Sequence, residues 1–315
     1  MSKCSAICMG IEIGSARRPA EDPVRESPGG TPRLVPVWVA ELTRERFCHV
    51  TAGFDNAREM DILMFQRRVV EAYETIFEQL EPTAFAHPVR FWAFVPGIHD
   101  DLGAGLDRYM AFNAGRYGAF AAHFGRPTSF DRSIPTASAV GVQGDQFLLH
   151  CLATDEPGLP VENPRQVSAY HYSRRFGPMP PCFARATLLR GRTHQPMLLV
   201  GGTASITGEE SRHAGDLDAQ ARETFRNLAS VVASAAGRTR PDDLGTAEIK
   251  TLLAAFRELR VYYTDAAHQC SLGGLVDATF SPQCRVEWMQ ASLCRPELLI
   301  EIEGLALPPT RQRES

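Results

Sequence analysis

Near the C-terminal end of the chain, apolar and acidic side chains alternate. Leu299, Ile300 and Ile302 are apolar, and Glu301 and Glu303 lie between and after them. Because successive side chains of a β-strand point to opposite faces, the pattern predicts a strand with both carboxylates on one face. A polar face is normally the solvent side of an antiparallel strand, so the pattern alone predicts two solvated glutamates.

The first half of the chain combines two helical patterns with short apolar strands. Apolar residues recur at helical spacing over residues 54–80 and 106–124, which predicts two amphipathic helices. Short runs rich in β-branched, aromatic and aliphatic residues predict strands at 35–42, 89–95, 139–141 and 146–153.

The same order of elements recurs after a proline-rich break at residues 155–164. Strands are predicted at 183–189, 197–202, 259–263, 285–291 and 298–307, with a helix at 216–236. This order predicts an α+β fold of two fused units, 34–160 and 161–315, each a mixed sheet with helices packed on one face. Residues 1–33 are rich in Pro, Gly, Arg and Glu, which predicts a flexible leader.

Composition and net charge indicate which kinds of binding partner to expect. The 315 residues are 44% hydrophobic and 22% charged with a net charge of -4, and no basic run with interleaved aromatics occurs, so nucleic acid is not expected as a partner. The first residues carry only a short, weakly apolar stretch, so neither a signal peptide nor a membrane span is predicted. We expect a cytoplasmic protein, as a monomer or a small homo-oligomer.

The cysteines and histidines give no sign of a metal centre. The eight cysteines are scattered and contain no CxxC pair, which favours reduced thiols over disulfides or a zinc site. The nine histidines also lack metal-ligand spacing. No metal and no cofactor are predicted.

Candidate chemistry is concentrated in residues 163–186, where arginines alternate with aromatic rings. Guanidinium groups bind carboxylates through two hydrogen bonds, and neighbouring tyrosines add hydrogen bonds and stacking. The stretch therefore predicts a clamp for a small anion, although such segments also wrap domain junctions. Its arginines are Arg165, Arg174, Arg175 and Arg185, and its aromatic residues include Tyr170, Tyr172 and Phe176. The residues chosen as candidates for substrate contacts are Arg165, Tyr170, Tyr172, Arg174 and Arg175.

Three other stretches are candidates. Residues 201–213, GGTASITGEESRH, have small side chains that let a ligand approach the backbone closely, but they lack the pattern of a nucleotide-phosphate loop. Arg116 lies in the aromatic-rich YMAFNAGRYGAF, which is more typical of core packing. Arg285 and Cys294 precede the acidic strand.

Taken together, NPRQVSAYHYSRRFGPMPPCFARAT, LLVGGTASITGEESRH, YMAFNAGR and CRPELLIEIEG resemble the chorismatase family over roughly residues 35–308. The resemblance implies two fused RidA/YjgF-like units and an enzyme that converts chorismate with loss of pyruvate, without a cofactor. It places Glu301 as the general acid that protonates the enol-pyruvyl group. It also places Arg285, with the arginines of the clamp, on the substrate carboxylates, and Tyr170 and Tyr172 on its hydroxyl and ring.

The resemblance leaves the product open. Cys294 matches the choice of members that form 3-hydroxybenzoate, whereas Ala204 resembles the choice of chorismate hydrolases, which give a dihydroxycyclohexadienoate. We expect 3-hydroxybenzoate and pyruvate, with 4-hydroxybenzoate as a second candidate product. The alternative is that the protein is not an enzyme but a RidA-like module that binds a small carboxylate.

Overall fold

The computed structural model describes residues 35–42, 45–125, 127–190, 196–238, 240 and 242–309, so the predicted leader lies outside the described residues. The first unit is built on a five-stranded sheet of order β1-β2-β5-β3-β4. Its elements are β1 Val35–Leu42, β2 Glu45–Phe54, α1 Ile62–Leu80, β3 His87–Pro96, α2 Arg108–Phe124, the short α3 Phe130–Ser133, β4 Thr136–Val142 and β5 Phe147–Thr154.

The second unit is built on a six-stranded sheet of order β12-β11-β13-β8-β7-β6. Its main elements are β6 Leu159–Val161, β7 Ala186–Leu189, β8 Met197–Ala204, α4 Leu217–Ala235, α5 Thr246–Leu253, β11 Phe256–Tyr263, α6 His268–Thr279, β12 Arg285–Gln290 and β13 Ile300–Ala306. A small hairpin of β9 Ile206–Thr207 and β10 Glu210–Ser211 follows β8.

The two units repeat one topology. If β7, β8, β11, β12 and β13 are matched in chain order to β1, β2, β3, β4 and β5, the two sheets have the same strand order. The parallel pairs match as well, β3 with β4 and β11 with β12. The predicted α+β fold of two units, each a mixed sheet with helices on one face, is confirmed.

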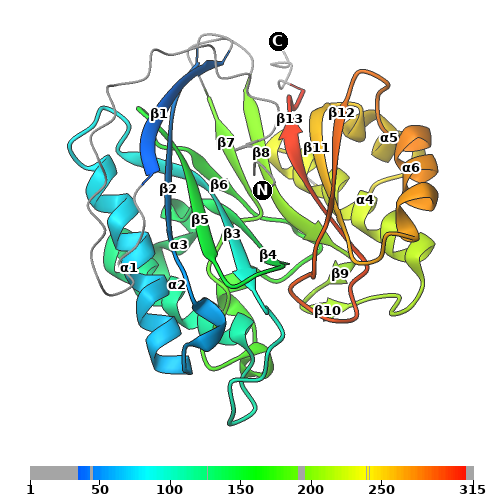
Figure 1. The fold of residues 1–315 in the computed structure, drawn as a ribbon. Coiled ribbons are helices and arrows are strands. Elements are labelled where there is room, and N and C mark those ends of the chain that lie inside the picture. Colours follow the sequence, from blue (N-terminus) through cyan, green and yellow to red (C-terminus); the bar gives the residue numbers. More distant parts are fainter. Residues whose placement is uncertain are drawn as a thin grey trace.

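The two sheets face each other, and the helices cover their outer faces (Figure 1). Helices α1 and α2 form one core with the first sheet, and α4, α5 and α6 form another with the second sheet. A third apolar cluster, which includes Phe47, Trp92 and Leu199, lies between the sheets. Side chains that point into the space between the two sheets are therefore shielded from water by both units.

Two of the differences between the predicted and the observed elements concern the first helix and α5. Residues 45–54 form β2, paired along its length with β5, so the first helix begins at Ile62 rather than at Phe54. Asp61 caps that helix by accepting a hydrogen bond from the Met64 N–H at 2.8 Å. Helix α5 was not predicted, because its eight residues are too few for a clear helical period.

Helices α1 and α2 pack closely at Gly115. A Cβ atom at this position would lie 2.8 Å from both the Gln66 carbonyl oxygen and Val69 Cγ1. Gly274 in α6 is the opposite case, since a Cβ there meets nothing within 4 Å.

Gly115→Ala and Gly274→Ala should therefore change stability in opposite directions. We expect the first to lower the free energy of unfolding by about 1–3 kcal/mol through overpacking. The second should raise it by about 0.5–1 kcal/mol, because alanine is the better helix former. Urea unfolding at an unchanged m-value measures both. Equal stability of the two variants would contradict the close packing of α1 on α2.

Candidate active site

A cavity of about 220 Å³ lies where the two units meet. The first unit contributes residues of α2 and β4, and the second contributes β8, β13 and the loop at 294–297. The segment from Tyr172 to Arg185, between β6 and β7 of the second unit, closes another side. Strand β4 reaches the second unit through bridges from Thr136 to Ala184 and from Gly141 to Ser292.

Glu301 lies in this cavity with only 5% of its surface exposed. Its strand neighbours are Ala204 of β8 and Tyr262 of β11. A Cβ atom at Gly202 would overlap the Glu301 carboxyl group, and one at Gly201 would lie 2.5 Å from Thr136 Oγ1. The glycine pair of GGTAS thus makes room for the carboxyl group of Glu301 and for the approach of β4.

The surroundings of Glu301 favour its protonated form. Burial and, after it, the negative charge of the nearby Glu303 raise the pKa of its carboxyl group to about 8. The positive charges of Arg90 and Arg185 act in the opposite direction. Within the part of the chain that the structure describes, no side chain or backbone N–H donates a hydrogen bond to this carboxyl group. These surroundings favour the neutral acid near neutral pH, and the residue lines the cavity.

The prediction of two solvated glutamates from the alternating pattern was wrong. Glu303 shares the face of Glu301, as predicted, but its side chain is fully buried between the sheets. It forms an ion pair with Arg90, whose Nη2 lies 2.6 Å from Glu303 Oε2. The face that carries both acids is covered by the first unit, which a strand pattern alone does not reveal.

The cavity is strongly cationic opposite Glu301. Arg116, Arg185 and Arg295 line it and are 1%, 5% and 9% exposed. Among the described residues, none of these three guanidinium groups forms an ion pair with a carboxylate, and their hydrogen bonds go to neutral oxygens. Buried cations without counter-ions are costly, so the site is suited to an anionic ligand.

Each of these arginines is held in place by neutral partners. Arg116 Nη2 donates to Asn113 Oδ1 at 2.8 Å, and Arg185 Nη2 donates to the Tyr172 hydroxyl at 2.8 Å. Arg295 stacks on the Phe176 ring, with 4.0 Å between the guanidinium carbon and the ring centroid. Positions fixed in this way reduce the entropy lost when a ligand binds.

The structure brings five of the predicted residues together at the cavity. Its lining includes Tyr172, Arg175, Ala204, Cys294 and Glu301. Burial and the nearby Glu301 raise the pKa of the Cys294 thiol to about 12, so the thiol is neutral.

Four other residues predicted to contact the substrate, Arg165, Tyr170, Arg174 and Arg285, lie outside the lining of the cavity. Arg165 is engaged by Glu223 and by Asn227 Oδ1 at 2.9 Å. Tyr170 packs on Phe130 in the core of the first unit, and Arg174 is exposed. Arg285 lies on the edge strand β12 and pairs with Glu258 at 3.0 Å.

Sequence reasoning undervalued the arginines that do line the cavity. Arg116 was interpreted as part of a core helix. Arg185 was counted among the arginines of the clamp but was not assigned to the substrate, and Arg295 was not singled out. Tyr109 also lines the cavity, about two helical turns before Arg116 on α2. A fully buried arginine in an aromatic helix is the signal that could have indicated Arg116, since such a charge needs a partner.

The described residues contain no group of three or more His, Cys, Asp or Glu side chains placed to hold a metal ion. In the same part of the chain, no helix combines the length and apolar character that crossing a bilayer requires.

Comparison with known proteins places this geometry in a family. Residues 37–153 match the family model of the N-terminal region of FkbO/Hyg5-like chorismatases. The chain is 34% identical over 240 residues to a 3-hydroxybenzoate synthase of Streptomyces hygroscopicus, covering 75% of this chain and 68% of that protein. The chain belongs to the chorismatase family.

Two further comparisons also match this chorismatase-family protein to chorismatases. A chorismatase of Streptomyces rapamycinicus is 29% identical over 282 residues, which cover 85% of this chain and 80% of that protein. A chorismatase crystal structure superposes with a TM-score of 0.70 at 25% identity, covering 86% of this chain and 80% of that chain.

In this chorismatase-family structure, Glu209 fastens the segment that covers the cavity. Its carboxylate accepts hydrogen bonds from the Ser173 backbone N–H and hydroxyl, both at 2.8 Å, and these donors lower its pKa. Its backbone carbonyl accepts from Arg295 Nη1 at 2.9 Å. The side chain of Glu210, its neighbour, forms an ion pair with the exposed Arg175, which also lies 3.5 Å from Glu209. Residues 173–177 are thereby tied to the β9–β10 hairpin.

Glu209→Ala should release this segment. We expect faster backbone amide exchange at Ser173–Gly177 by hydrogen–deuterium exchange, with little change in the midpoint of thermal unfolding, because the lost contacts are at the surface. Glu210→Ala, which leaves both Ser173 hydrogen bonds intact, is the matched control. Unchanged exchange in Glu209→Ala would show that the segment is held by other contacts.

Proposed function

We propose that this protein converts chorismate to 3-hydroxybenzoate and pyruvate without a cofactor. Membership of the chorismatase family and the 34% identity to a 3-hydroxybenzoate synthase support the reaction class. The substrate is a small molecule, and the presence of six described cysteines as free thiols is compatible with the cytoplasm as the place of the reaction.

One observation carries the proposal: a buried carboxyl group with a raised pKa lines a cavity together with three arginines that have no carboxylate partner among the described residues. Chorismate has two carboxylates and an enol-pyruvyl ether, so its turnover needs cationic binding groups and an acid that protonates the enol carbon. Glu301 has the raised pKa that such an acid requires near neutral pH. Arg116, Arg185 and Arg295 are the cations that we assign to the carboxylates.

The reaction begins with transfer of the Glu301 proton to the methylene carbon of the enol-pyruvyl group. The resulting oxocarbenium ion makes the ether a good leaving group, and its C–O bond to the ring breaks to release pyruvate. The ring hydroxyl attacks the neighbouring carbon that the ether leaves, which gives a protonated arene oxide. The bond from this oxygen to its original carbon then breaks. Loss of the hydrogen on the carbon that now bears the hydroxyl makes the ring aromatic and returns one proton to Glu301. Hydroxybenzoate and pyruvate together contain all the atoms of chorismate, so no water is consumed.

The remaining residues of the cavity fit secondary roles. The Tyr172 hydroxyl is held by Arg185 and borders the same space, and Arg175 lies at its exposed rim. We propose that the neutral Cys294 thiol and the small Ala204 shape the space beside Glu301, where water must be excluded for the internal attack to succeed. Water attack in the same place would give the dihydroxycyclohexadienoate of a hydrolase.

Replacing Glu301 by Gln should separate catalysis from binding. We expect pyruvate release from chorismate to fall by a factor of about 10²–10⁴, the usual contribution of a general acid. Thermal stabilisation by chorismate should persist, because the arginines are unchanged. A coupled assay for pyruvate and a thermal-shift titration measure the two effects.

Glu258→Gln is the control, since Glu258 is also a partly buried strand glutamate but pairs with Arg285 outside the cavity. Its turnover should equal that of the wild type. If wild-type protein binds chorismate and releases no pyruvate, the chain is a binding module and the proposed reaction is wrong.

Cys294→Ala should change the product rather than the rate of pyruvate release. We expect less 3-hydroxybenzoate and more dihydroxycyclohexadienoate, because the smaller side chain admits water beside Glu301. Chromatography with absorbance detection distinguishes the aromatic product from the diene. Cys284→Ala, a change outside the cavity, is the control. An unaltered product ratio in Cys294→Ala would remove Cys294 from product selection.

A further inference from the structure

Glu303, two residues beyond Glu301, is surrounded by hydrogen-bond donors. Its Oε2 accepts from Arg90 Nη2 and Ser138 Oγ, both at 2.6 Å. Its Oε1 accepts from Trp92 Nε1 at 2.8 Å, and from Arg260 Nη1 and the Tyr262 hydroxyl at 3.1 Å. Five donors on two oxygens, two of them from guanidinium groups, are the environment of an ionised carboxylate.

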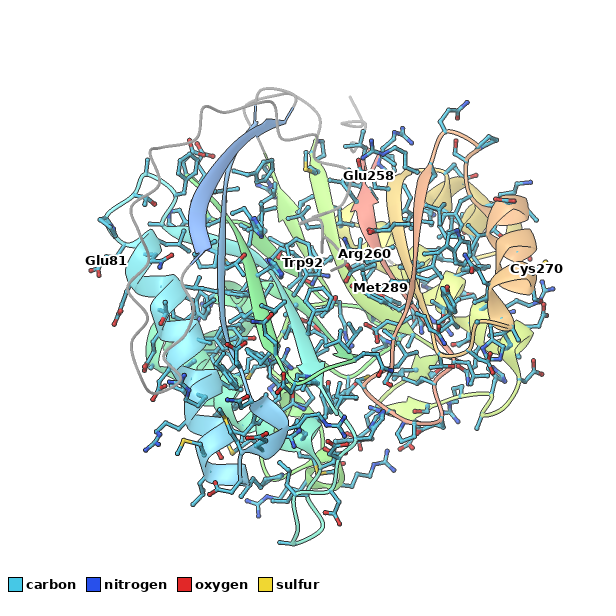
Figure 2. The ribbon with its side chains drawn as sticks, viewed as in Figure 1. Glu81, Trp92, Glu258, Arg260, Cys270 and Met289 are labelled. Carbon is cyan, nitrogen blue, oxygen red and sulfur yellow. The ribbon has the colours of Figure 1, made fainter. Side chains whose placement is uncertain are left out.

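The donors come from both units. Arg90, Trp92 and Ser138 belong to the first sheet, and Arg260 and Tyr262 belong to the second. Figure 2 shows Trp92 and Arg260 between the two sheets, where both contact Glu303. Glu303 does not line the cavity, and its side chain is fully buried, so it cannot touch a substrate.

The same contacts reach the carboxyl group of Glu301. Ser138 Oγ, which donates to Glu303, accepts the Gly202 N–H at 2.8 Å. Gly202 is the residue against which the Glu301 carboxyl group rests. One hydroxyl group therefore connects the buried anion to the backbone that positions the acid. The two glutamates differ sharply, because one has five donors and the other has none among the described residues.

We propose that Glu303 is a positioning residue for the reaction: through Ser138 and Gly202 it fixes the Glu301 carboxyl group, and its buried negative charge keeps the proton on Glu301. The inference rests on the proposed function, in which Glu301 is the proton donor. A like charge nearby disfavours ionisation of a carboxyl group, and low-dielectric surroundings strengthen the effect. Burial is the largest cause of the raised pKa of Glu301, and the negative charge of Glu303 comes next.

Other charged and titratable groups around the two glutamates also affect the pKa of Glu301. Arg90 and Arg185 oppose the effect of Glu303 on Glu301, and Arg260 is shared with Glu287 at 2.7 Å. The remaining groups on the elements that pack here are His150 of β5, Tyr262 of β11, Tyr109 and Arg116 of α2, and Cys294, Arg295 and Glu297 of the loop before β13.

The pH dependence of kcat/KM for pyruvate release tests the proposal, because it reports the free enzyme. Glu301 donates only when protonated, so wild-type kcat/KM should fall as the pH rises through about 8. Glu303→Gln removes the neighbouring charge and lowers the pKa of Glu301. We expect the descending limb of the pH profile, where kcat/KM falls with rising pH, to move to lower pH by about one unit or more.

Matched variants separate charge from structure. Glu303→Asp keeps the charge and should return the limb toward its wild-type position. Glu287→Gln removes a partner of Arg260 that is 31% exposed, and its limb should stay in place because solvent screens that charge. Arg90→Gln removes an opposing charge and should move the limb to higher pH, which provides a test of opposite sign if Glu303→Gln does not fold.

The outcomes are distinct. Opposite shifts in Glu303→Gln and Arg90→Gln, or the upward shift of Arg90→Gln alone if only it folds, support the proposal. A lower rate with an unmoved limb in the variants that fold overturns it, since a purely structural role predicts that result. Absence of pyruvate from wild-type protein would instead refute the proposed function, before any variant is compared.

Discussion

The ion pair between Glu303 and Arg90 joins the two units inside the molecule. Both side chains are fully buried, and each comes from a different sheet. Removing one partner of such a pair typically costs about 3–5 kcal/mol, because the other charge remains buried. The pair therefore favours one relative placement of the sheets over others. That placement brings β4 against β8, and the cavity is lined by residues of α2 and β4 together with residues of β8 and β13.

The cavity separates its charges in an unusual way. Glu301 is buried without hydrogen-bond donors, while Arg116, Arg185 and Arg295 are buried without carboxylate partners among the described residues. If the acid reached these arginines it would ionise and lose its proton. A dianionic substrate satisfies the arginines instead, and it leaves the acid neutral when proton transfer begins. The empty site is thus less favourable than the occupied one, which promotes binding of the anion.

Much of the fold could be predicted because the patterns are local. The strand Val35–Leu42 was predicted with the bounds that the structure shows, and the predicted helices at 106–124 and 216–236 correspond to α2 and α4. Strand β2 was missed because its residues pair with β5, about one hundred positions later in the chain. Predicting it requires the partner strand, since isolated propensity for strands is weak and depends on context.

The sequence by itself determined the two-unit α+β order, the shared face of Glu301 and Glu303, and, through its resemblance to a family, the reaction to test. Only the tertiary structure decided which charges meet. Arg285 and Arg165 pair with glutamates of their own unit, whereas Arg116 of the first unit lines the same cavity as Glu301 of the second. Burial and charge partners depend on residues far apart in the chain, so a linear pattern of polar and apolar positions does not contain them.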